Sequence, residues 1–153
     1  MAKNITMNAK DAIAAKLAKC FITLNGNRYN FANMIDMEVK LEKAKSTIPR
    51  LGAIMTGHKS TGMEGTFSGT MHSSDLSVLR KVLEDYKNTG EDVYFDMQIE
   101  NNDPTSTAKS QTVILYDCNT DGGILAKFDA DGEYIDEEIE GTFEDFSIPE
   151  SFK

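Results

Sequence analysis

Ile35-Asp36-Met37-Glu38-Val39-Lys40-Leu41-Glu42 alternates apolar and charged residues without exception. Because successive side chains of a β-strand point to opposite faces, this stretch predicts a strand with one buried face and one face in water. Residues 63–72 alternate in the same way, with methionine, glycine and phenylalanine on one face and small polar residues on the other. Two such stretches favour an antiparallel sheet, which commonly packs one face and exposes the other.

A hairpin is expected immediately before the first of these strands. Cys20–Leu24 and Arg28–Phe31 are both strand-like, and Asn25-Gly26-Asn27 separates them. Asn-Gly between two such runs is a strong hairpin signal, because both residues accept the positive φ angles of a tight turn.

Further strands are expected in the second half of the chain. Residues 93–100 alternate before an Asn-Asn-Asp-Pro break. Residues 111–116 and 124–128 predict a second hairpin across an Asn/Asp- and glycine-rich turn. Residues 135–146 predict the last strand, which we expect Pro149 to end.

One helix interrupts the strands, at residues 75–88. Ser74 or Asp75 can cap its N-terminus, and leucines recur with Tyr86 at helical spacing. Gly90 provides a stop signal. The expected fold is therefore mainly β (α+β): an antiparallel β-barrel or sandwich with one packed α-helix.

The chain of 153 residues fits a single domain, 1–153, without disulfides or a metal. Residues 1–17 are expected to form an N-terminal arm, and Asp11–Lys19 suits either a short helix or an extended segment. No basic and apolar leader begins the chain, and no apolar run approaches the ~20 residues of a membrane span. We therefore expect the protein to be made and folded in a cytoplasm, with Cys20 and Cys118 as reduced, buried thiols.

The net charge of −9 argues against binding nucleic-acid phosphates as the main task. Its distribution is polarised: residues 1–60 carry ten Lys/Arg against four Asp/Glu, and residues 61–153 carry six against twenty-one. The two parts have net charges of +6 and −15. One copy could therefore place a basic surface against an acidic surface of the next, although two solvated surfaces explain the same pattern.

Two apparent ligand motifs do not meet their chemical requirements. Residues 52–60 resemble a phosphate-binding loop, but His58 stands where that loop needs lysine. Residues 117–124 resemble the start of a calcium-binding loop, but Phe128 occupies the position of the bidentate glutamate. Turns between strands explain the second stretch. We expect no cofactor, no metal and no catalytic residues, because no nucleophile lies near a base in a catalytic pattern.

The stretch Ser46–Thr61 is predicted to be a long loop, since it contains Pro49, Gly52 and Gly57, with Gly62 just beyond it. It is basic and also more apolar than a solvated loop needs to be. It is therefore either a solvated loop or an arm that contacts another molecule. The contact residues of such an arm would be Arg50, Leu51, Ile54, Met55, His58 and Lys59.

Met55-Thr56-Gly57-His58-Lys59-Ser60-Thr61-Gly62 resembles the segment that closes the long loop in tail-tube proteins of contractile phages, PBSX-type defective prophage particles and R-type contractile bacteriocins. Residues 141–150 resemble the family's C-terminal run, and the order of elements is similar after about residue 18. The Ala/Lys-rich stretch before Cys20 departs from the family pattern.

The resemblance implies a structural subunit and not an enzyme. Such proteins form hexameric rings that stack head to tail into the inner tube of a contractile tail. The implied partners are further copies of the chain, the tail sheath, and the baseplate and tail-terminator proteins, with DNA passing without specific binding. The subunit would be cytoplasmic during assembly and then part of a phage tail or tail-like particle, with no membrane binding of its own.

Two further expectations follow from the resemblance. Ser46–Thr61 would be the arm between rings, and Asp36, Glu38, Lys40 and Glu42 would face the lumen unless they face the outer surface or the sheath. The particle could be a DNA-carrying phage or a DNA-free bacteriocin. The alternatives are a β-barrel module that binds a small ligand or a protein, an unrecognised hydrolase using paired acids, and the tube of a type VI secretion-like system.

Overall fold

The computed structural model describes residues 9–12, 18–30, 34–72, 77–122, 125–126, 130–132 and 136–152. A short 3₁₀ turn, η1 (Ala9–Asp11), precedes the sheet, and the α-helix of the described residues is α1 (Ser77–Thr89). The strands are β1 (Ala18–Leu24), β2 (Asn27–Asn30), β3 (Met34–Ile48), β4 (Gly57–His72), β5 (Phe95–Asn102), β6 (Ser110–Gly122), β7 (Asp136–Phe143) and β8 (Asp145–Glu150). The helix is too short and too polar to cross a membrane, and it is the longest that the structure describes.

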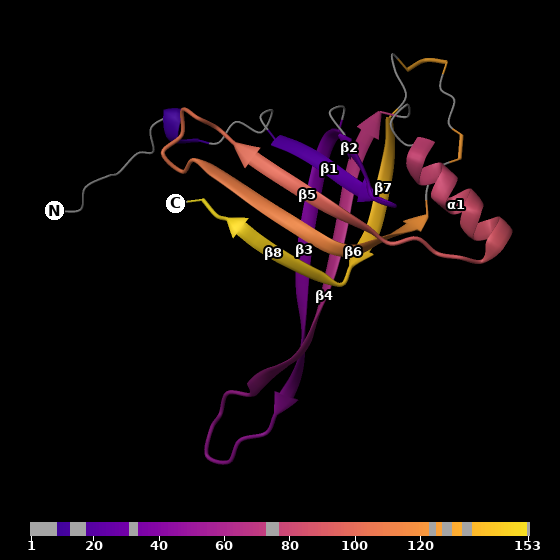
Figure 1. Cartoon of the computed structure of the whole chain (residues 1–153). Coiled ribbons are helices and arrows are strands. Elements are labelled where there is room, and N and C mark those ends of the chain that lie inside the picture. Colours follow the sequence, from indigo (N-terminus) through magenta and orange to yellow (C-terminus); the bar gives the residue numbers. More distant parts are fainter. Residues whose placement is uncertain are drawn as a thin grey trace.

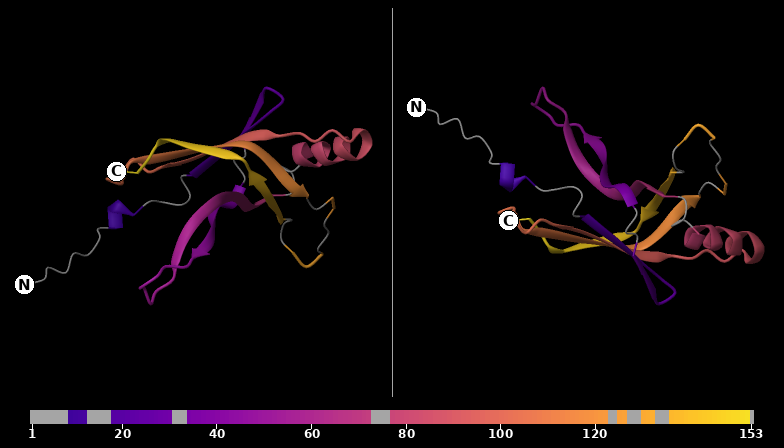
Figure 2. Two further views of the ribbon diagram at one scale, coloured as in Figure 1. Left: turned by 90° about the horizontal axis from the view of Figure 1, so that it is seen from below. Right: turned by 90° about the horizontal axis from the view of Figure 1, so that it is seen from above.

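The strands form one antiparallel sheet in the order β2-β1-β5-β6-β7-β4-β3, and β8 pairs with β6 beside that path (Figure 1). The sheet folds over on itself, so that β1, β5, β6 and β8 form one layer and β3, β4 and β7 form the other (Figure 2). The tip of the β1–β2 hairpin and the β3–β4 hairpin project in opposite directions (Figure 2). The predicted mainly β fold with one helix is confirmed, in its sandwich form.

The first hairpin follows from its Asn-Gly dipeptide. Asn25 and Gly26 have φ angles of 51° and 80°, which are the left-handed values that a two-residue hairpin turn requires. Leu24 pairs with Asn27 directly across this turn. The predicted hairpin is confirmed.

A β-bulge in β6 lets this strand belong to both layers. Tyr116 and Asp117 together stand opposite Asp96 of β5, and Asp117 has a φ of 54°. The backbone N–H of Asp117 donates to a carboxylate oxygen of Asp96 at 3.3 Å. Such a bulge bends a strand. Before it β6 pairs with β5 and β8; after it Cys118 still pairs with Phe95 of β5, and from Asn119 onward β6 pairs with β7.

This path of β6 corrects the expectation of a turn after residue 118. Asn119 pairs with Thr142, Thr120 with Gly141 and Gly122 with Glu140, so the calcium-like stretch is mostly strand. A strand pairing holds these residues apart, whereas a calcium loop must wrap them around one ion. The predicted strand 124–128 lies largely outside the described residues.

The last predicted strand, 135–146, is in fact two strands. It breaks at Glu144, whose N–H donates to the carbonyl of Tyr116 at 3.1 Å, and the chain crosses there from one layer to the other. Pro149 does not end the strand but lies inside β8. Proline is tolerated there because β8 pairs only with β6 and its other edge is free among the described strands.

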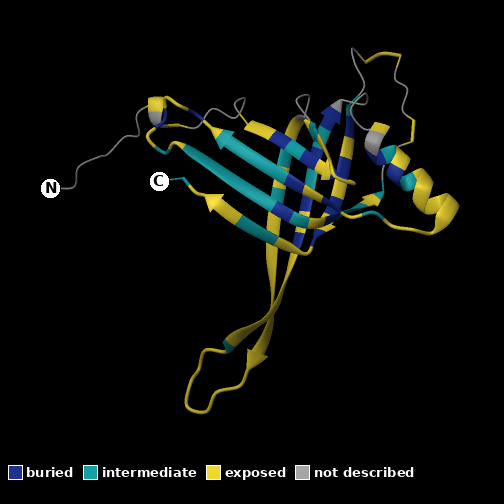
Figure 3. Cartoon of the chain, viewed as in Figure 1, coloured by how far each residue is buried: buried dark blue, intermediate teal, exposed yellow. Residues whose placement is uncertain are grey.

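The core lies where the two layers cross, and it appears as the dark centre of the molecule in Figure 3. Phe67 of β4 meets Phe95 of β5 edge to face, with ring centroids 6.3 Å apart. Cys20 and Cys118 are buried free thiols within it, as predicted. The remaining buried apolar residues are Ile22, Leu24, Met71, Leu79, Val82, Met97, Leu115, Ile139 and Phe143.

Helix α1 packs on one end of the sandwich through Leu79 and Val82. The predicted stripe was partly wrong, since Tyr86 is exposed and Val82 makes the buried contact instead. The stop signal is confirmed: Gly90 has a φ of 74°, and its N–H donates to the carbonyl of Tyr86 at 2.8 Å. The helix extends to Thr89, one residue beyond the predicted end. Arg80 forms an ion pair with buried Glu137 of β7, which ties the helix to the sheet.

The predicted loop at residues 46–61 is wrong in its extent. Strand β3 continues to Ile48 and β4 begins at Gly57, so that Ser46 pairs with Lys59 and the loop itself is residues 49–56. The ribbon leaves the sandwich before Gly65, the first residue of β4 that pairs with β7, and it contains a register shift near Thr61, whose hydroxyl donates to the carbonyl of Ala44 at 3.2 Å. Residues 42–64 form this projecting hairpin, which we call the arm (Figure 1).

Candidate functional site

Apolar side chains that are exposed to solvent cluster at the tip of the arm. Leu51 and Ile54 are fully exposed and Met55 is 79% exposed, and the rest of the arm is exposed except for Gly57, which is intermediate (Figure 3). Arg50 braces the tip, because its guanidinium donates to the carbonyl of Met55 at 2.9 Å. A clustered apolar surface of this kind is typical of an interaction site.

The base of the tip is basic. His58 and Lys59 are exposed on β4, opposite Thr47 and Ser46. The fold therefore brings all six predicted contact residues to one end of the molecule. Arg50 differs from the others, since its side chain already holds the loop together. Whether these residues contact another ring stays a prediction.

A polar face covers the outer side of β3, β4 and β7. Strand register aligns Glu38, Ser68 and Glu140 in one row. The next row is Asp36, Thr70 and Glu138, and a third is Lys40, Thr66 and Thr142. Hydroxyl side chains thus lie on the central strand, and in the first two rows carboxylates flank them on both sides. We call these three rows the acidic face.

The four predicted lumen residues, Asp36, Glu38, Lys40 and Glu42, are all exposed on the acidic face or beside it. Glu42 accepts a hydrogen bond from Lys40, with nitrogen and oxygen 3.0 Å apart, and this contact raises the pKa of the Lys40 ammonium. Sequence reasoning missed Glu138 and Glu140, whose alternation with buried residues was visible but whose neighbours on β4 were not. Among the residues that the structure describes, no group of His, Cys, Asp or Glu is placed to hold a metal.

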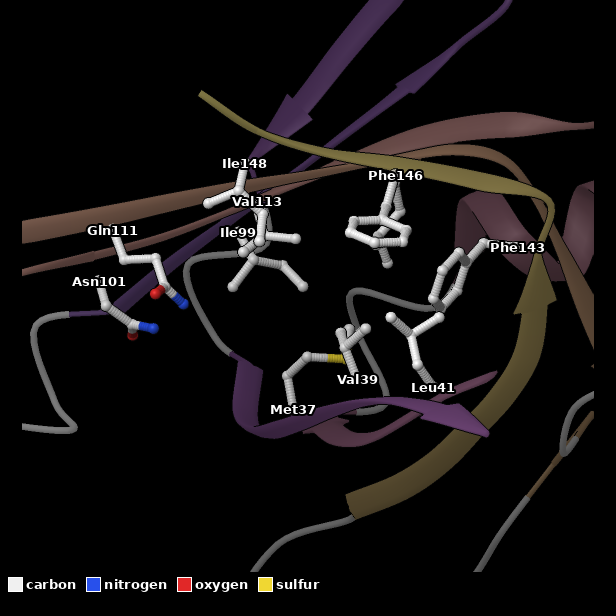
Figure 4. A pocket seen from close by; sticks show the side chains of 11 residues that line it. Met37, Val39, Leu41, Ile99, Asn101, Gln111, Val113, Phe143, Phe146 and Ile148 are labelled. Atoms are coloured by element: carbon white, nitrogen blue, oxygen red, sulfur yellow. The ribbon is translucent and has the colours of Figure 1, made fainter. Parts of the chain in front are cut away.

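A groove opens between the two layers on the other side of β3. One wall of the groove belongs to β3 and consists of Met37, Val39 and Leu41 (Figure 4). These side chains face apolar residues of the opposite layer, namely Ile99, Val113, Phe146 and Ile148. Phe143 closes one end. The cavity has a volume of about 330 Å³. Its walls are mainly apolar, with Asn101 and Gln111 at the far end.

Residues 5–150 match the phage tail tube protein family. The chain belongs to this family. It is 36% identical over 146 residues to the phage-like element PBSX protein XkdM of Bacillus subtilis (strain 168), and the match covers 95% of this chain and 96% of that protein. The tail tube protein is therefore a structural component of a phage tail or phage-like particle, as the resemblance implied.

Solved structures share the fold of this tail tube protein. A chain of the 6-fold symmetrised baseplate of the anti-feeding prophage has a TM-score of 0.67 at 12% identity, with 94% of this chain and 97% of that one covered. A chain of the sheath-tube complex of an extracellular contractile injection system, PVC, in its extended state has a TM-score of 0.62 at 10% identity, with 94% of both chains covered. At these identities the likeness concerns the fold alone.

Proposed function

We propose that the protein forms six-membered rings that stack head to tail into the inner tube of a contractile tail or a tail-like bacteriocin, and that it has no catalytic role. Membership of the tail tube family carries this proposal. The 6-fold symmetry of the baseplate with the similar chain supports the ring size. No described strand pairs with the outer edges of β2 and β3, and this supports lateral contacts, because closing a ring of copies covers such edges.

The acidic face lines the bore of the tube in this proposal. Its carboxylates would repel nucleic-acid phosphates, so DNA would pass without adhering. The exposure of the predicted lumen residues supports this orientation, and so does their alignment with Glu138 and Glu140. The alternative is that the acidic face is directed at the sheath. A structure of the assembled tube with a predominantly basic bore would refute the proposed orientation.

The arm makes the contact between rings. It extends beyond the sandwich, and its tip presents apolar and basic side chains that the isolated subunit leaves in water. Contacts that repeat without closing build a filament. The sheath, the baseplate and the tail terminator complete the set of proposed partners, and assembly takes place in the cytoplasm before the tube joins a particle.

Electron microscopy of the purified protein tests the proposal. We expect rings or tubes whose fraction rises with protein concentration and changes with salt, because part of the contact is electrostatic. If no rings or tubes form at any concentration or ionic strength, even with the baseplate proteins added as a nucleus, the proposal is wrong.

A further inference from the structure

We propose that the groove between the two layers is the docking site for the arm tip of a second copy. This inference rests on the proposed stacking of rings and names the surface that receives the arm. Four observations support it: the continuity of the groove, the apolar surface of the tip, the charge of both partners and the reach of the arm.

The groove extends beyond the cavity of about 330 Å³. A second hollow of about 540 Å³ adjoins the first, since Leu41, Phe143 and Phe146 line both. Phe143 and Phe146 meet edge to face at the junction, with centroids 6.5 Å apart. The two hollows therefore form one trough. Half-buried apolar side chains such as Val39 and Val113 line its first part. Its second part combines apolar side chains such as Met63 with polar residues.

The arm tip offers the apolar side chains that such a trough accepts. Leu51, Ile54 and Met55 stand close together in the chain and are almost wholly exposed. A ribbon of two strands is marginally stable alone in water, and β7 supports β4 only from Gly65 onward. Burying these three aliphatic side chains against another copy would remove their apolar surface from water and so stabilise the ribbon.

Charge favours the same arrangement. Arg50 and Lys59 flank the tip and Lys45 follows along the arm, while Glu144 and Asp145 line the second hollow of the groove. Glu64 adds a third carboxylate at that end. A basic tip and an acidic rim attract one another, and like charges would repel a tip that approached another tip.

The reach of the arm requires a second copy. Leu41 lines the groove at the base of the arm, and seven residues of strand separate it from the loop. At about 3.3 Å per residue the tip lies more than about 20 Å from its own groove. The ribbon would have to fold back on itself to enter it, which its cross-strand pairs oppose.

Disulfide trapping between two variants tests the inference. Ile54→Cys places a thiol at the tip, and Ile148→Cys places one in the groove wall, where Ile148 is 50% exposed. Each variant keeps Cys20 and Cys118 buried and unreactive. Mixing the two variants under assembly conditions with an oxidant should give a disulfide dimer that joins positions 54 and 148, as mapped by mass spectrometry.

Two measurements serve as controls. Pairing Ile54→Cys with Tyr86→Cys, an exposed position on α1, should give at least tenfold less cross-linked dimer. A maleimide should label the Ile148→Cys variant quickly as a free subunit and at least tenfold more slowly in tubes. Slow labelling already in the free subunit would mean that its own chain fills the groove, and that result would overturn the inference.

The outcomes separate this inference from the proposed function. Tubes in which the thiol at position 54 bonds to another tip, or to a surface outside the groove, would overturn the inference and leave the tube function in place. Absence of both tubes and cross-links would overturn both.

Discussion

Phe67 lies directly over Gly141, its partner on the neighbouring strand. A Cβ on Gly141 would come within 2.5 Å of the Phe67 Cζ atom and would also strike the backbone carbonyl of Asn119 on β6. Two positions along, the glycine is on β4 and the phenylalanine on β7: Gly65 pairs with Phe143 and lies under its ring. The junction where β4, β6 and β7 meet is therefore closed by two aromatic rings on two glycines.

Gly141→Ala should lower the free energy of unfolding by roughly 1–3 kcal/mol, because overpacking of a filled core costs about that amount. The carbonyl of Asn119 belongs to a paired strand and cannot move aside. Urea unfolding monitored by circular dichroism measures the change. Gly62→Ala is the matched control, since nothing lies within 4 Å of its added Cβ. Equal midpoints for the two variants would contradict the packing described for Gly141.

The ion pair between Arg80 and Glu137 should hold α1 on the sandwich. The side chain of Glu137 is wholly buried and that of Arg80 is 26% exposed. Arg80→Met removes the cation that faces a buried carboxylate, so the protein should lose about 3 kcal/mol of stability. Arg80→Met/Glu137→Leu should be closer to the wild type than Arg80→Met alone, because no charge then remains buried at this contact. A double-mutant cycle in urea measures the coupling, and strictly additive effects would show that the pair is not coupled.

Sequence reasoning succeeded where local rules decide the structure. The alternation of residues 35–42 is enough to place one face in water, and Asn25-Gly26 determines the first turn. The strand pairing within the arm was missed because residues 42–48 and 57–64 are rich in lysine, threonine and glycine and show no apolar alternation. Its pairing follows from the register that β3 and β4 already have in the sandwich, and no local signal in residues 46–61 encodes it.

The acidic face also depends in part on strand pairing that no local sequence signal predicts. Asp36, Glu38, Lys40 and Glu42 could be found from alternation along one strand. Glu138 and Glu140 join them only because β4 lies between β3 and β7, and this neighbourhood depends on contacts far apart in the chain. The path of β6 across two layers depends on the Asp117 bulge, which the sequence presents as an ordinary turn.

The two thiols should react only after the protein unfolds. Burial raises the pKa of Cys20 to about 12, and burial together with the nearby Asp96 carboxylate raises the pKa of Cys118 to about 12. Since the thiolate is the reactive form, alkylation at pH 8 should be at least a hundredfold slower in the native protein than in guanidinium chloride. Both thiols are neutral in the fold and ionise in the unfolded chain near pH 8.5, so their contribution to stability is complete below that pH and is lost as the pH rises toward 12. Rapid native labelling would show that the core described here opens readily.

Replacing residues 50–59 with a short Gly/Ser linker should abolish tubes and leave the sandwich folded. The replaced residues lie beyond the part of β4 that β7 supports, and none of them is buried. Circular dichroism should therefore show a similar spectrum, while electron microscopy should show no stacked rings. A linker variant that still forms normal tubes would mean that the arm is not the stacking element, and one that unfolds would place the arm in the core.

Lys59→Glu should weaken stacking more at low salt than at high salt. Lys59 is exposed on the arm, within the basic part of a chain whose remainder carries a net charge of −15. Reversing its charge turns an attraction into a repulsion over a Debye length of about 10 Å at 0.1 M salt and about 3 Å at 1 M. The protein concentration needed for tubes, measured by light scattering, should rise roughly tenfold at low salt, as a change of about 1.4 kcal/mol per contact implies, and return toward the wild-type value at 1 M. Lys81→Glu on the exposed side of α1 makes the same change in net charge away from the arm. If Lys81→Glu shifts the threshold as much as Lys59→Glu does, net charge and not the arm governs the stacking.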